Sequence, residues 1–167
     1  MSIRVIRGFF VLLALAAISG SLPGVTSAKE GGLTIVRIFT GWRDAASFKR
    51  ISEYFDGREN TGGQTVLRTH PEERSGYYFL IRTANAGAAT PVKINLELIL
   101  PSNPKTQNYT FPTDLPNGGA VLNLGLTGED WPNARSNPIA WKLAIVAADG
   151  RVLATEESYL WEKPAEK

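Results

Sequence analysis

Hydrophobic and polar residues alternate with a period of two over most of the chain after residue 33. Between Pro91 and Pro101, every second position from Ile94 to Leu100 is apolar, and the positions between them are mostly polar. Such alternation is typical of a strand that buries one face. The same pattern predicts further strands at residues 33–39, 65–69, 77–83, 107–111, 120–126 and 141–147. Short strands at this spacing, separated by turn-rich stretches, predict an all-β sandwich of about seven to eight strands.

A hairpin is expected at the end of the chain. The last alternating strand is followed by Asp149-Gly150, the pair favoured by two-residue type I′ turns, in which both central residues have positive φ. Residues 151–161 then return as the partner strand. If that strand lies at a sheet edge, Glu156 and Glu157 would guard it against pairing with another chain, although a free edge is equally a place where a partner strand can add.

One segment departs from the period of two. Over residues 44–55, apolar residues recur at helical spacing between Ala45 and Phe55. Asp44 suits the N-cap of a helix and Gly57 suits its end. The second half of the segment also alternates, so a strand is the competing interpretation. We favour one short helix here.

A single turn carries a resemblance to a known fold family. The chain forms a predicted strand, then Asn85-Ala86-Gly87, then a second predicted strand. This arrangement resembles many bacterial immunoglobulin-like modules, in which an Asn-x-Gly turn joins two core strands. The resemblance covers residues 77–100 only and implies an immunoglobulin-like or fibronectin type III-like β-sandwich. It implies nothing about a ligand, because such folds host unrelated functions.

The N-terminus has the three parts of a secretory signal peptide. Arg4 and Arg7 form a basic start, residues 8–18 are small or apolar, and small residues ending at Ala28 form a cleavage site. The apolar run is shorter than the roughly 20 residues that a membrane-spanning helix needs. The chain is therefore expected to divide into a cleaved signal peptide, a single β-sandwich domain and a charged C-terminal tail, at residues 1–28, 29–161 and 162–167. We expect the protein to be secreted or periplasmic.

Charge and cysteine content narrow the classes of function. The chain has 18 Lys+Arg and 16 Asp+Glu residues, and loss of Arg4 and Arg7 with the signal peptide leaves 16 of each. A neutral chain with no strongly basic half argues against nucleic-acid binding, which needs a basic face. The absence of cysteine excludes disulfides, thiolate metal sites and cysteine nucleophiles. It also fits a bacterial envelope better than an animal extracellular space.

Candidate catalytic groups are few. His70 is the single histidine, so a serine-type triad would have to use it, yet no nucleophile-elbow motif accompanies it. Glu53, Asp56 and Glu59 would share one face of a continued helix, where a pair of carboxylates could hydrolyse a glycosidic bond. The interpretation that we favour is a solvated acidic edge paired with neighbouring cations. We predict no catalytic residue, no metal site and no cofactor.

The aromatic residues offer the better candidate site. Trp141 lies on an alternating strand and is expected in the core, whereas Trp42 and Trp131 have loop-like surroundings. An exposed ring beside acid and amide groups suits a sugar, so Trp131, Trp42, Tyr54 and Asp130 are the candidate ligand-binding residues. The competing interpretation, which we favour, is that each loop tryptophan folds back to close an open end of the sandwich.

The most economical expectation is an exported, non-catalytic binding module that presents loops and a sheet face to a protein or a cell-envelope component, including polysaccharide. Two alternatives stay open. A carbohydrate-binding module predicts that the loop aromatics are exposed and nearly coplanar. A small secreted hydrolase predicts a concave pocket that holds at least two of Glu53, Asp56 and His70. No nucleic acid and no stable membrane span are expected, and the sequence leaves the oligomeric state open.

Overall fold

The computed structural model describes residues 32–131 and 133–161, so the predicted signal peptide and C-terminal tail lie outside the described residues. Within these residues, eight strands form two four-stranded sheets. The strands are β1 (Leu33–Arg43), β2 (Thr65–Arg68), β3 (Gly76–Asn85), β4 (Thr90–Leu100), β5 (Asn103–Leu115), β6 (Gly118–Thr127), β7 (Ala140–Ala147) and β8 (Val152–Glu157). The short helices are η1 (Ala45–Phe48), α1 (Glu53–Asp56) and η2 (Gly128–Asp130). No helix in this part of the chain is long and apolar enough to cross a bilayer.

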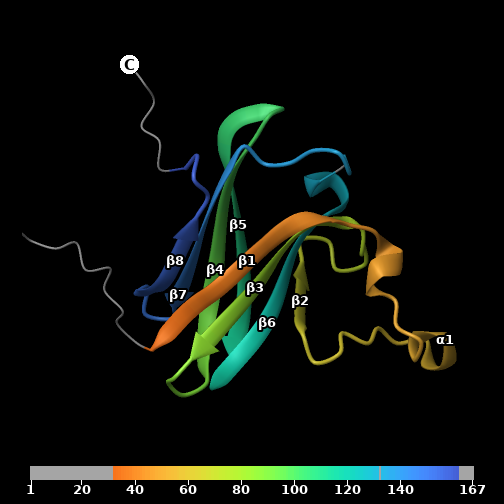
Figure 1. Cartoon of the computed structure of the whole chain (residues 1–167), viewed down its shortest axis with the longest axis horizontal. Coiled ribbons are helices and arrows are strands. Elements are labelled where there is room, and N and C mark those ends of the chain that lie inside the picture. Colours follow the sequence, from red (N-terminus) through yellow and green to blue (C-terminus); the bar gives the residue numbers. More distant parts are fainter. Residues whose placement is uncertain (1–31, 132, 162–167) are drawn as a thin grey trace, which may run out of the picture.

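The two sheets form a sandwich with immunoglobulin-like strand order (Figure 1). The first sheet has the order β1-β3-β6-β2 and the second has the order β5-β4-β7-β8. An immunoglobulin domain places strands A, B, E and D in one sheet and C, F and G in the other. Here β1, β3 and β6 take the places of A, B and E, while β4, β7 and β8 take those of C, F and G. The predicted all-β, immunoglobulin-like sandwich is confirmed.

Strand β2 departs from the usual topology. It occupies the edge place of strand D, beside β6, but it precedes β3 in the sequence. It also runs parallel to β6, with Thr65 opposite Leu122 and Arg68 opposite Gly125. The chain reaches this place through the long connection between β1 and β2, which projects from the sandwich and carries α1 (Figure 1).

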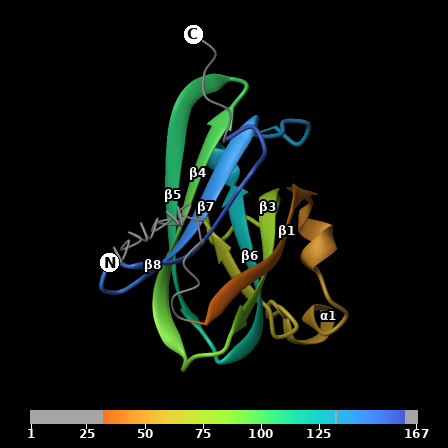
Figure 2. The ribbon, with the colours of Figure 1, turned by 60° about the vertical axis from the view of Figure 1, so that its left-hand side comes forward.

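The core lies between the two sheets. In Figure 2, β5, β4, β7 and β8 form one layer and β1, β3 and β6 lie in the other. Tyr77, Phe79 and Ile81 share the inner face of β3 and are 3%, 0% and 0% exposed, as their alternation predicts. Trp141 is half-buried and packs edge-on against Phe79, with ring centroids 5.7 Å apart. Other fully buried core side chains are Ile94, Leu96, Leu98, Leu122, Leu124, Leu126, Leu143 and Ile145.

The Asn-x-Gly turn joins β3 of the first sheet to β4 of the second, as the resemblance implied. Asn85 holds this corner with its own side chain. Its Oδ1 accepts from the N–H of Gly87 at 2.9 Å, and its Nδ2 donates to the carbonyls of Ala88 and Pro116 at 3.1 and 3.0 Å. A buried amide with these bonds fixes where the chain crosses between the sheets.

The closing hairpin exists, but its predicted type I′ turn is wrong. Gly150 has a φ of 86°, whereas no non-glycine residue in the described part of the chain has a positive φ, so Asp149 lacks the required conformation. The N–H of Gly150 donates to the carbonyl of Ala147 at 3.0 Å, and the N–H of Ala147 donates to that of Arg151 at 2.9 Å. These bonds enclose a three-residue loop, 148–150, of the kind in which a turn is followed by a glycine bulge.

The segment predicted as one helix over residues 44–55 contains two separate helical turns, η1 and α1. Both predicted ends are confirmed: the Asp44 carboxylate accepts from the N–H of Ser47 at 2.8 Å, and Gly57 closes α1 with a φ of 67°. Lys49 is extended between them, with φ −71° and ψ 125°, and this breaks the helix.

The two long sides of the sandwich differ. On one side, β1 lies against β8. Strand β8 lies at an edge, as expected, but it ends at Glu157 rather than at residue 161. On the other side, the edges are β2 and β5.

Candidate functional site

The connection of residues 44–64, here called the β1–β2 loop, covers part of the outer face of the first sheet. Side chains alternate along β3, so Tyr78 points away from the core that holds Tyr77 and Phe79. Tyr78 is nevertheless only 1% exposed. Phe48 of the loop packs on it, with ring centroids 4.6 Å apart and planes tilted by 46°.

The sheet provides a recess for this tyrosine. Gly125 of β6 lies directly opposite Tyr78 of β3. A methyl group at Gly125 would lie 2.5 Å from Cε1 of Tyr78, so any side chain there would force the tyrosine ring to move. The glycine therefore lets the tyrosine ring lie flat on the sheet beneath Phe48.

The hydroxyl of Tyr78 begins a chain of polar contacts that reaches into the loop. It donates to the carbonyl of Arg74 at 2.8 Å and accepts from Nε of Arg68, also at 2.8 Å. Nη1 of Arg68 donates to Oε2 of Glu59 in the loop at 3.0 Å. Burial raises the pKa of Tyr78 above its ordinary value, so its hydroxyl stays protonated in neutral solution.

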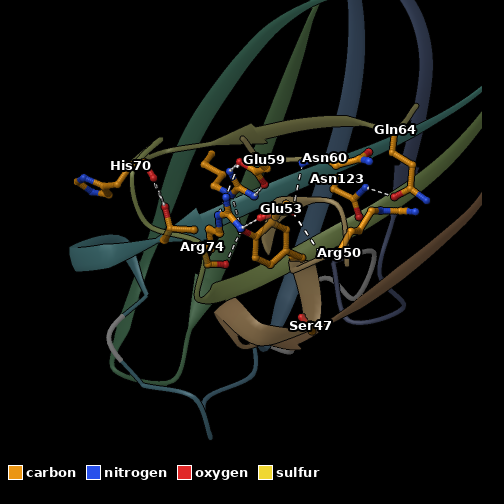
Figure 3. A network of polar contacts seen from close by, with 12 residues as sticks. Ser47, Arg50, Glu53, Glu59, Asn60, Gln64, His70, Arg74 and Asn123 are labelled. Carbon is orange, nitrogen blue, oxygen red and sulfur yellow. Dashed lines mark hydrogen bonds and ion pairs between the residues drawn. The ribbon is translucent and has the colours of Figure 1, made fainter. Parts of the chain in front are cut away.

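Glu53 is the second attachment of the loop (Figure 3). It is 8% exposed and lies at the first residue of α1. Its Oε2 accepts from Nη1 of Arg74 at 2.6 Å, and its Oε1 accepts from the backbone N–H groups of Asn60 and Arg50 at 3.1 and 3.3 Å. The hydrogen bond from Arg74, followed by that from Asn60, holds the pKa of Glu53 below its ordinary value. The side chain thus closes the loop onto itself and ties it to the sheet.

A third contact secures the end of the loop. Nδ2 of Asn123 on β6, a residue 1% exposed, donates to Oε1 of Gln64 at 2.9 Å. Within the loop, Nδ2 of Asn60 donates to the hydroxyl of Ser52 at 2.9 Å. The loop is therefore fixed at several points along its base.

The far end of the loop is apolar and exposed. Ile51, Tyr54 and Phe55, here called the tip, are 79%, 73% and 86% exposed. Turn hydrogen bonds join Tyr54 N to Ile51 O at 3.2 Å and Phe55 N to Ser52 O at 3.0 Å. Residues three and four positions apart in a helical turn are neighbours, so Ile51 lies near both Tyr54 and Phe55 at this end of the loop. Nζ of Lys49 lies 5.0 Å from the centre of the Tyr54 ring.

The structure does not bring the predicted ligand-binding residues together. Trp131 is 3% exposed and stacks on Tyr77 in the core, with ring centroids 4.5 Å apart, so an exposed platform at this position is wrong and the folded-back interpretation is confirmed. Trp42 is half-buried on β1 and packs against the core. Tyr54 alone is exposed, at the tip.

Asp130 and His70 do lie together, which the sequence did not predict. Nε2 of His70 lies 3.2 Å from Oδ2 of Asp130, and both side chains are partly exposed. Glu53, the other group of the hydrolase alternative, is bound to Arg74 instead. The side chain of Asp56 is not among those described.

The sequence predicted neither the exposure of Ile51 and Phe55 nor the part that Arg68 and Arg74 take in fixing the loop. The helical spacing of Ile51 and Phe55 predicts a helix but does not tell whether these side chains are exposed. The partners of Glu53 and Glu59 lie 21 and 9 positions away along the chain. No local pattern could pair them.

Comparison with known proteins adds little beyond the fold. No family model and no curated protein sequence matches this chain. Among solved structures, it is similar to an immunoglobulin-like protein from Pseudomonas aeruginosa, with 17% identity and a TM-score of 0.31, over 75% of this chain and 93% of that one. The fold assignment stands on the strand order. The chain is an immunoglobulin-like β-sandwich.

Proposed function

We propose that this protein is an exported, non-catalytic module that binds a protein of the cell envelope through the tip of its β1–β2 loop. The observation that carries this proposal is the exposure of Ile51, Tyr54 and Phe55 on a loop whose base is fixed to the sheet. Export rests on the signal-like sequence of residues 1–28.

Exposed apolar side chains become informative when they gather. Single exposed hydrophobic residues are common on protein surfaces, whereas contiguous patches mark interaction sites. A tyrosine and a phenylalanine beside an isoleucine supply the rigid, partly amphipathic surface that is frequent among the strongest contacts of protein interfaces. The tip therefore has the composition of an anchor that enters an apolar pocket on a partner.

The fixed base makes such an anchor effective. A flexible loop would lose conformational entropy on binding, and that loss would weaken the complex. Here Glu53 and Glu59 each bind an arginine next to or within the sheet. These contacts hold the base of the loop in the absence of a partner, so less ordering should accompany binding.

The charges of the loop favour a protein surface over a polyanion. The carboxylates of Glu53 and Glu59 are paired with Arg74 and Arg68 at the base of the loop. The tip itself contributes three uncharged side chains, and one cation, Lys49, lies 5.0 Å from the centre of the Tyr54 ring. Apolar packing is therefore expected to dominate the contact, which then depends weakly on salt. Binding to a nucleic acid would instead fall steeply as salt rises.

Site-specific crosslinking in the cells that make the protein tests this proposal. A photo-reactive phenylalanine analogue is placed at Phe55, and in a matched control at Val152, which is 55% exposed on β8. The proposal expects a discrete protein crosslink from position 55 and none of the same size from position 152. Equal crosslinks from both positions, or none from position 55, would contradict it.

A further inference from the structure

The open side of the sandwich contains a groove separate from the tip. One wall is formed by residues 66–69, which are the end of β2 and the residue after it. The other wall is formed by residues 108–112 of β5, and the volume between them is about 640 Å³. Both strands lie at the edges of their sheets, and no further described strand pairs with them on this side. A free strand edge has backbone N–H and C=O groups that a second chain can use.

A proline shows which backbone N–H and C=O groups of β5 point away from β4, toward the free edge. Pro112 lies opposite Lys93 of β4. Proline lacks an N–H, so within a ladder it is tolerated where its nitrogen points to the free edge. Successive residues of a strand direct their N–H and C=O groups to opposite sides. The N–H and C=O groups of Asn108 and Thr110 therefore also point to the free edge. The hydrogen bond of 3.0 Å between Thr110 Oγ1 and Asn95 Oδ1 agrees, because opposing side chains approach most closely at such pairs.

The facing wall has free backbone groups as well. The N–H of Thr69 donates to the carbonyl of Gly125 on β6 at 3.0 Å. By the same alternation, Leu67 faces β6, whereas Val66 and Arg68 direct their backbone groups away from it, into the groove. The groove therefore has hydrogen-bonding backbone on both walls.

The side chains of the groove define what would fit between these walls. Phe111 is 4% exposed and Tyr109 is half-buried, and both point inward from β5, so the floor consists of two aromatic rings and the Tyr109 hydroxyl, which donates to Oε1 of Gln107 at 3.0 Å. The guanidinium of Arg68 is bonded to Glu59 and to the Tyr78 hydroxyl, and the Arg68 side chain is 5% exposed. Asp130 is the carboxylate among the lining residues; its side chain is 30% exposed, its Oδ2 lies 3.2 Å from Nε2 of His70, and it also interacts with the Tyr109 hydroxyl. An occupant would place apolar side chains on the floor and a cation beside Asp130.

We propose that an extended segment of another polypeptide, with a lysine or arginine at one end, adds as a strand to the free edge of β5 in this groove. The length of β5 favours it over β2 as the pairing edge, because β5 has 13 residues and β2 has four. Pro112 limits the pairing to the part of β5 that precedes it, since a proline offers no donor. The main chain of β5 gives affinity, and Asp130 and the floor give selectivity.

This binding site does not depend on the tip. The tip is a loop end on the outer face of the first sheet, whereas the groove lies at the edges of both sheets. Failure of one proposal therefore leaves the other standing.

A display library of short random peptides tests the strand addition. The library is selected on the protein expressed from its full-length coding sequence, and selected peptides are then measured on Thr110→Pro. This substitution removes a free-edge N–H and leaves the backbone hydrogen bonds between β4 and β5 in place, while it also removes the side-chain bond from Thr110 Oγ1 to Asn95 Oδ1. As a matched variant, Pro112→Thr adds an N–H to the same edge.

The expected result is a set of peptides with a basic residue at one end. Their affinity falls about tenfold in Thr110→Pro, the size expected for one lost hydrogen bond, and rises in Pro112→Thr. In their presence the amides of Asn108 and Thr110 become protected from hydrogen exchange. In Asp130→Asn, the preference for the basic residue is lost.

Synthetic peptides keep the test independent of how the variants fold. Methylating alternate backbone nitrogens of a selected peptide removes the donors of one edge only, so one of the two methylated series should lose binding and the other should keep it. Absence of any enriched peptide would overturn the proposal. Equal binding of both methylated series, or of Thr110→Pro and the unsubstituted protein, would also overturn it.

Discussion

Oε2 of Glu53 lies 2.6 Å from Nη1 of Arg74, so the first residue of α1 is joined to the residues that lead into β3. The same carboxylate accepts two backbone N–H groups from either side of α1. One side chain thus organises the loop that holds the tip and connects it to the sheet. The consequences can be measured at the base of the loop and at its end.

Replacing Glu53 with glutamine should loosen the loop without unfolding the sandwich. The remaining ion pair of Arg74 within the described residues is then with Glu59, whose Oε2 lies 3.8 Å from its Nε. Native-state hydrogen exchange should show faster exchange at the amides of Arg50 and Asn60, while β3 and β4 stay protected. Glu72→Gln, an exposed substitution nearby, is the control and should change neither. Unaltered exchange at Arg50 and Asn60 in Glu53→Gln would show that the ion pair does not hold the loop.

Stability should fall in acid because of the two loop carboxylates. Hydrogen bonds from Arg74 and Arg68 lower the pKa values of Glu53 and Glu59 below their ordinary value of 4.5. A group whose pKa is lower in the folded state stabilises the fold fully above its unfolded pKa, and this contribution disappears as the pH falls through the folded pKa. The Tm should therefore decline below a pH of about 4.5.

The double variant Glu53→Gln, Glu59→Gln separates this effect from other titrations. Its Tm should be lower than that of the unsubstituted protein at neutral pH, and the two should converge in acid, where the native carboxylates are protonated. A difference in Tm that is the same at neutral and at strongly acidic pH would contradict the assignment.

Trp131 should behave as a core residue. It is 3% exposed and stacked on Tyr77, so Trp131→Ala should lower the free energy of unfolding by about 3–5 kcal/mol in urea denaturation. Its Nε1 has no hydrogen-bond partner among the described residues, so Trp131→Phe loses no such bond and should cost less. A stable Trp131→Ala that only lost binding to a glycan would instead restore the carbohydrate-binding alternative.

The N-terminus gives a prediction that is independent of the fold. Expression of the full-length coding sequence in a bacterium with a general secretion system should yield a periplasmic product that begins at Lys29. Intact-mass measurement of the periplasmic fraction checks this. A product that retains residues 1–28 in the cytoplasm would contradict the export proposal.

Strands such as β4 and β7 were predictable because buried and less buried residues alternate along them. Residues that alternate between core and solvent, such as those from Ile94 to Leu100, reveal both the strand and its inner face. The position of β2 was not predictable, since its parallel pairing with β6 joins residues more than fifty positions apart. The type of turn at Gly150 was also not predictable, because an Asp-Gly pair suits both the two-residue turn and the three-residue loop that forms.

The sequence predicted the helical spacing in the β1–β2 loop but not the exposure of its tip, for a related reason. Helical spacing of apolar residues normally indicates a face that is buried. Phe48 follows this rule by packing on Tyr78, whereas Ile51 and Phe55 have the same spacing and are exposed. The difference depends on where the loop is attached, and that is set by Arg68 and Arg74, which no local pattern connects to the loop.

Competition for the crosslink at position 55 tests the central claim most directly. Envelope extract is crosslinked with the photo-reactive protein in the presence of increasing amounts of unlabelled competitor. Unsubstituted protein should abolish the crosslink. The triple variant Ile51→Ser, Tyr54→Ser, Phe55→Ser should fail to compete while keeping the Tm of the unsubstituted protein, because its three changed side chains are exposed. A triple variant that competes as well as the unsubstituted protein would show that the tip is not the binding surface.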